Sequence, residues 1–215
     1  MAILVTVLSV SSAMIMHGLV QATANGSRAY FLRAHIQWQI LPAYLVGAAM
    51  ATGLFVSLTL VPNAAMILIS IGLFPWAARA LPALKGLNIT HKNTAMFCGV
   101  IVTGAQLFAG ASGPLLDIFY LNTPLTRHQV IATKALTQTL GHILKLFYYT
   151  LIIQVSDSMP VWVLILAMGS AIFGTRVGTR LVDRFSDAQF RKVSSQAILV
   201  IGTLCLVKGI RDLLA

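Results

Sequence analysis

Apolar residues occur in blocks, most of them long enough to cross a membrane, separated by short polar connections. The blocks cover residues 2–24, 38–60, 64–80, 94–109, 114–122, 130–154, 160–178 and 194–210. About 20 apolar residues in a helix span the hydrocarbon core of a bilayer. The pattern therefore predicts an all-α, polytopic membrane protein with about seven helical segments, one of them broken within residues 94–122.

The broken segment contains a run of small residues, Gly110, Ala111, Ser112 and Gly113, followed by Pro114. Neither limb is long enough to span comfortably, so we expect a re-entrant hairpin that enters and leaves on one side. The distribution of bases favours this topology, because it places eleven Lys and Arg residues on one side and two on the other. The eleven are Arg28, Arg33, Arg79, Lys85, Lys92, Arg127, Arg176, Arg180, Arg184, Arg191 and Lys192, and the two are Lys208 and Arg211.

This topology divides a single membrane domain into two halves, residues 1–92 and 93–215. The first three full segments have a basic first loop and an uncharged second loop, and the last three have the reverse. Such a reversal is expected of an inverted-topology repeat, a common transporter architecture. The similarity in sequence between the halves is weak.

Composition supports the membrane assignment and removes several other classes. The chain is 58% hydrophobic and 9% charged, whereas soluble domains carry about 25% charged residues. The net charge of +10 does not indicate nucleic acid, because the bases lie mostly in loops between apolar segments. The sequence has no Glu, no paired carboxylates, no metal-ligand spacing and no nucleophile–base motif, so we expect no enzyme, cofactor or metal.

A cationic stripe follows the break. On a helix, Lys134, Gln138, His142 and Lys145 fall within about 80° of one another. Apolar residues lie on the opposite side, namely Leu136, Leu140, Ile143 and Phe147. A charge inside a membrane costs several kcal/mol, so the stripe suggests a functional site.

The break itself has two interpretations. Pro114 suits the first position of a helix, and Ser112 or Gly113 can cap it. The free amide groups near Gly110, Ala111, Ser112 and Gly113 would then face an anion. Alternatively, the small residues make a kink for helix packing.

Each ionisable residue near the break also has alternatives. Lys134 could balance a bound anion, pair with Asp117 or extend to the interface, and Lys145 lies too deep to extend so easily. Asp117 is a proton-coupling acid or a structural partner of Lys134. His142 is a proton carrier or a core histidine.

The order of these features resembles the TauE/SafE sulfite-exporter family. The similarity rests on the break, on Thr133, Lys134 and Thr137 at the start of the next helix, and on the glycines Gly169, Gly174 and Gly178 before Arg180. It implies a multi-pass protein of the bacterial inner membrane that moves sulfite, sulfonates or related organic anions. Family members have two related halves, each opening with a broken helix.

The chain departs from that pattern in its first half, which lacks the broken helix. Either residues are missing before Met1, or this is a shortened member. The resulting hypothesis is alternating-access transport of a small anion bound by Gly110, Ala111, Ser112, Gly113, Thr133, Lys134, Thr137, Gln138 and Lys145, with Asp117 or His142 as the proton carrier. The alternative is a shortened, non-transporting membrane scaffold or assembly partner.

Overall fold

The computed structural model describes residues 1–80, 86–153, 160–182 and 187–214, and within them all regular structure is helical. The all-α prediction is therefore confirmed. The longer helices are α2 (Val10–Phe31), α3 (Leu41–Leu58), α4 (Ala64–Ala80), α5 (Lys92–Ala109), α6 (Gly113–Tyr120), α7 (Arg127–Phe147), α8 (Val161–Val182) and α9 (Asp187–Leu214). Shorter pieces are α1 (Leu4–Val7), the 3-10 turns η1 (Arg33–His35) and η2 (Trp38–Ile40), and the π-helical turn η4 (Tyr148–Ile152).

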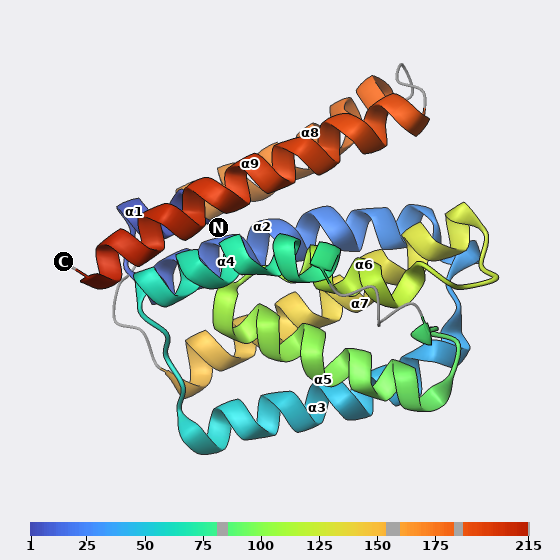
Figure 1. Cartoon of the computed structure of the whole chain (residues 1–215), viewed down its shortest axis with the longest axis horizontal. Helices are drawn as coiled ribbons and strands as arrows, with labels where there is room; N and C mark the ends of the chain where they lie inside the picture. Colours follow the sequence, from blue (N-terminus) through green and yellow to red (C-terminus); the bar gives the residue numbers. More distant parts are fainter. Residues whose placement is uncertain (81–85, 154–159, 183–186, 215) are drawn as a thin grey trace.

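The helices pack in pairs. The α3 helix lies against α5, α2 against α7 and also against α8, and α4 against α9. Figure 1 shows α8 and α9 along one side of the molecule and α3 with α5 along the opposite side. The helices α2, α4, α6 and α7 lie between these two pairs (Figure 1).

A chain reversal at Gly110 makes a hairpin of α5 and α6. Gly110 has φ +72°, a left-handed conformation that favours glycine, and its N–H donates to the Gln106 carbonyl. The Ile89 N–H, just before α5, donates to the Phe119 carbonyl near the end of α6 (3.1 Å). The start of α5 and the end of α6 are therefore at the same end of the molecule (Figure 1).

The contact between α3 and α5 depends on glycines. A Cβ atom at Gly47 would lie 1.9 Å from the Met96 carbonyl oxygen, and one at Gly99 would lie 2.1 Å from the Tyr44 carbonyl oxygen. Only the absence of a side chain at both positions lets the two backbones approach this closely. Gly53, on the same helix as Gly47, has no such neighbour within 4 Å.

The predicted first segment and first loop have different boundaries in the structure. The helix is interrupted between α1 and α2. Ser9 is the N-cap residue of α2, and its side chain accepts a hydrogen bond from the Ser12 N–H. Helix α2 then continues to Phe31, so residues 25–31 are helical and not part of a loop. No proline ends the helix earlier, and Asn25 and Gly26 are tolerated because α7 and α8 pack against α2.

Helix α7 begins at Arg127, earlier than predicted, because Thr126 and Gln129 form a capping box. Helices α8 and α9 are also longer than the predicted segments. The predicted short loop at residues 155–159, together with Lys85 and Arg184, lies outside the described residues.

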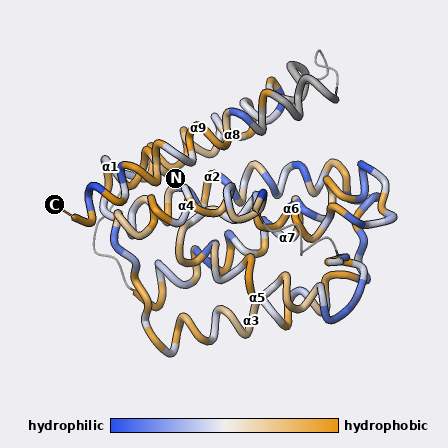
Figure 2. Tube along the Cα trace, in the orientation of Figure 1, coloured by the Kyte–Doolittle hydropathy of each residue, from blue (hydrophilic) through white to orange (hydrophobic). Residues whose placement is uncertain are grey.

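Large apolar side chains remain exposed over much of the surface, especially on α3, α8 and α9. Figure 2 shows hydrophobic residues along much of the described traces of these helices. Examples are Met50, Leu54 and Leu58 on α3, Trp162, Ile165 and Phe173 on α8, and Val200, Leu204 and Val207 on α9. By length and composition, two helices in the described part could cross a membrane, Trp38–Leu58 and Val161–Gly178. The core helix of a soluble protein meets the same criterion, but Val161–Gly178 contains no buried residue.

Candidate functional site

The polar stripe of α7 faces the interior, between α2 and the α5–α6 hairpin. Ile143 and Phe147, predicted for the opposite face, are 50% and 44% exposed. His142 and Lys145 are buried. The stripe therefore forms one continuous face, and its polar groups lie at different depths along the helix.

The outer part of the stripe opens into a cavity of about 270 Å³, with the start of α6 in its wall. Lys134 and Gln138 line it, together with Gly113, Asp117 and Arg28. The Lys134 ammonium pairs with the Asp117 carboxylate, and both side chains are partly exposed. Of the alternative roles predicted for Lys134, the structure shows the ion pair with Asp117.

A buried amide–hydroxyl network joins the break to α7. The Gln106 Nε2 donates to the Gln138 carbonyl (3.3 Å), and the Ser112 hydroxyl donates to Gln106 Oε1 (3.0 Å). Ser112 occupies the N-cap position of α6, but its hydroxyl makes no capping bond. Helix α6 begins at Gly113, so Pro114 is its second residue and not its first, as was predicted.

The inner end of the stripe is a buried basic cluster of Lys145, His142 and His17. Lys145 has 0% exposure, and its Nζ donates to the Gly110 carbonyl (3.3 Å) and lies 3.0 Å from His17 Nδ1. The rings of His17 and His142 meet edge to face with centroids 5.6 Å apart. His142 is 4% exposed, and its Nδ1 has no hydrogen-bond partner.

Among the described residues, no acid forms an ion pair with the basic cluster. Among the described residues, none of the ion pairs involves Lys145, and Asp117 is already paired with Lys134. An ammonium group has three N–H donors, and the two contacts of Lys145 leave one of them. When Lys145 is protonated, its charge is therefore buried without an acid beside it.

Three predicted binding residues lie away from this face. Thr133 Oγ1 accepts from the Gln37 N–H (3.0 Å), and the Thr137 hydroxyl donates to the Lys134 carbonyl (3.0 Å). Both threonines are fully buried against other elements, because they project about 100° from their lysine and glutamine neighbours on the helix. Ala111 faces an apolar cavity of about 150 Å³ beside α4 and α9.

Two bases and a glutamine of this site were not predicted from the sequence. His17 is the one titratable side chain in the apolar block 2–24, and that isolation was the available signal. Arg28 was assigned to a loop, although it lies in the last turn of α2. Gln106 gave no signal in sequence, because its role depends on the reversal at Gly110.

No group of three or more His, Cys, Asp or Glu side chains suited to a metal ion occurs among the described residues. Comparison with protein-family models, curated proteins and solved structures finds no match to this chain.

Proposed function

We propose that this chain is a multi-pass membrane protein that transports a small anion. Support for the membrane location comes from the exposed apolar surface of α3, α8 and α9. Monomeric soluble proteins rarely expose contiguous apolar patches larger than a few hundred Å². In a bilayer, the same side chains would face lipid at no cost.

Charge distribution supports a common orientation for these helices. His35 and His128 stack with ring centroids 5.2 Å apart, so the end of α2 lies beside the start of α7. Bases gather at this end, at Arg28, Arg33, Lys92, Arg127 and Arg176, and Figure 2 shows hydrophilic residues there. The positive-inside rule makes it the cytoplasmic end, with α5 and α6 as a re-entrant hairpin opening toward it.

The single observation that carries the anion proposal is that Lys145 is fully buried and has no acid paired with it among the described residues. A buried charge is costly unless it is paired. A bound anion would supply the missing partner through the third N–H of Lys145 and the unpartnered Nδ1 of His142. The carbonyl of Gly110 ties this position to the break.

A route to this position follows α7. The cavity at Lys134 and Gln138 would admit the anion from the cytoplasmic end, and Lys145 lies about 16 Å further along the helix axis. The cluster is closed to solvent in this conformation, so the anion could reach it only if α2, the hairpin and α7 move relative to one another. Such movement is the essence of alternating access. His142 and Asp117 remain the candidates for proton coupling.

The substrate class comes from the resemblance to TauE/SafE sulfite exporters, and we propose sulfite, sulfonates or related anions on that ground alone. The inverted repeat is supported by packing, since α2 contacts α7 and α4 contacts α9. These are the first and last full helices of the two predicted halves. Close contact between equivalent elements is expected around a pseudo-twofold axis.

The test is uptake of radiolabelled sulfite into proteoliposomes that contain the purified chain, compared with protein-free vesicles. We expect protein-dependent uptake that unlabelled sulfite and methanesulfonate inhibit and that potassium replacement by choline leaves unchanged. Loss of uptake on potassium replacement would indicate that potassium, and not a proton, is the coupling ion. Absence of uptake by correctly folded protein would favour the scaffold alternative.

A further inference from the structure

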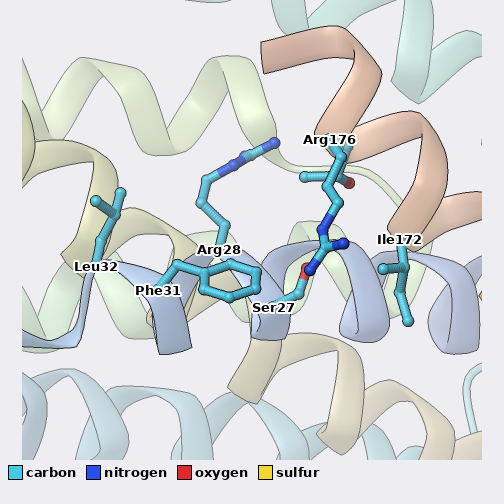
Figure 3. Close-up of a pocket in the computed structure, with 7 residues that line it drawn as sticks. Ser27, Arg28, Phe31, Leu32, Ile172 and Arg176 are labelled. Atoms are coloured by element: carbon cyan, nitrogen blue, oxygen red, sulfur yellow. The ribbon is translucent and has the colours of Figure 1, made fainter. Parts of the chain in front are cut away.

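A second cavity, of about 490 Å³, lies between α2 and α8 and shares Arg28 with the cavity at Lys134. Two arginines contribute to it from opposite walls, Arg28 from α2 and Arg176 from α8 (Figure 3). Its volume lies in the usual range of small-ligand sites, about 300–1,000 Å³.

The polar part of this cavity is cationic. No acid is among the described residues that line it, and the Arg28 guanidinium makes a long contact with Asn25 Oδ1 (3.5 Å). The Ser27 hydroxyl donates to the Ala24 carbonyl, so the guanidinium groups are the donors that remain for a ligand. Two guanidinium groups facing one space suit an oxyanion, which each can bind through two parallel hydrogen bonds.

The remaining wall is apolar. Phe31, Leu32 and Ile172 line it, and the Arg176 guanidinium lies over the Phe31 ring, 6.0 Å from its centroid. Phe31 and Ile172 are also exposed on the outer surface. The cavity therefore offers an anion site continuous with an apolar face, and a free inorganic ion would leave that apolar wall unused.

We propose that this cavity binds the phosphate group of an anionic phospholipid, with Arg28 and Arg176 on the phosphate and the acyl region against Phe31 and Ile172. The proposal rests on the membrane location given above and not on transport. Both arginines lie at the cytoplasmic end assigned above, where the headgroups of that leaflet would be.

The experiment measures lipid binding to the purified chain in detergent micelles by native mass spectrometry. Phosphatidylglycerol is the anionic probe, and phosphatidylcholine is the zwitterionic probe with the same phosphate. We expect preferential binding of phosphatidylglycerol, a roughly tenfold loss of affinity in Arg176→Gln and a smaller loss in Arg176→Lys. Arg33→Gln is the matched control, because Arg33 lies over the Tyr30 ring at the same end but outside the cavity.

Equal binding of the two lipids, or equal losses in the Arg176→Gln and Arg33→Gln variants, would overturn the proposal. Displacement of phosphatidylglycerol by equimolar inorganic phosphate would also overturn it, because the site would then recognise a free oxyanion. Circular dichroism and size-exclusion chromatography identify a misfolded variant, and Arg176→Lys, which keeps the charge, then carries the test. Sulfite uptake is measured separately, so failure of lipid binding is distinguishable from failure of transport.

Discussion

Replacement of Lys145 by methionine separates function from stability. Methionine keeps most of the unbranched side chain but removes the Nζ atom that contacts Gly110 and His17. The Gly110 carbonyl loses a partner, which costs about 1–3 kcal/mol. Removal of a buried, unpaired amine offsets this cost, so we expect a free energy of unfolding within about 2 kcal/mol of wild type.

The expected effect on transport is much larger. A hydrogen bond to a charged group contributes about 1.5–3 kcal/mol, and each 1.4 kcal/mol is a tenfold change in affinity. Lys145→Met should therefore lower sulfite uptake at subsaturating concentration by roughly tenfold to a hundredfold. Proteoliposomes normalised for protein content provide the assay.

Lys208→Met is the matched control. Lys208 is an exposed lysine near the end of α9, paired with Asp212 at 2.6 Å. Its replacement should leave uptake within twofold of wild type. Uptake by folded Lys145→Met within twofold of wild type, or an equal loss in Lys208→Met, would refute the role assigned to the buried ammonium.

Two further predictions concern charge and packing. Lys134→Ala should lower uptake several-fold, because it leaves the Asp117 carboxylate unpaired in the outer cavity. Adding Asp117→Asn should restore part of the lost uptake. A double variant with no more uptake than Lys134→Ala would contradict this prediction. Gly47→Ala places a Cβ atom 1.9 Å from a backbone oxygen of α5 and should destabilise the chain by about 1–3 kcal/mol, seen as a lower thermal midpoint in detergent. Gly53→Ala, which has nothing within 4 Å, should leave the midpoint unchanged or raise it slightly, and equal effects of the two substitutions would argue against the α3–α5 contact.

Local patterns in the sequence predicted the helices better than their ends. Helix α4 begins at the predicted residue 64, because the turn residues Pro62 and Asn63 precede an apolar run, and its described part extends to Ala80. The end of α2 was predicted too early, since tertiary contacts hold Asn25 and Gly26 in a helix that their propensities disfavour. The capping box at Thr126 was readable from sequence and was overlooked.

Only the residues of the candidate site that lie on one helix, α7, were predictable from the sequence. Helical periodicity put Lys134, Gln138, His142 and Lys145 on one face, and that face lines the interior. Which partner each side chain meets depends on α2 and the hairpin, which are distant in sequence. His17 lies 128 residues from Lys145 along the chain, and no local pattern connects them.

The different pairing of the two lysines of α7 has an electrical consequence. Lys134 is neutralised by Asp117, whereas Lys145 has no acid paired with it in the described part of the chain. Under the proposed function, a monoanion beside protonated Lys145 forms a neutral complex, and its movement does no work against the membrane potential. The empty carrier keeps one positive charge, and moving that charge across the full field costs about 2.3 kcal/mol per 100 mV. Membrane voltage would then act on the return of the empty protein and not on the step that carries the anion.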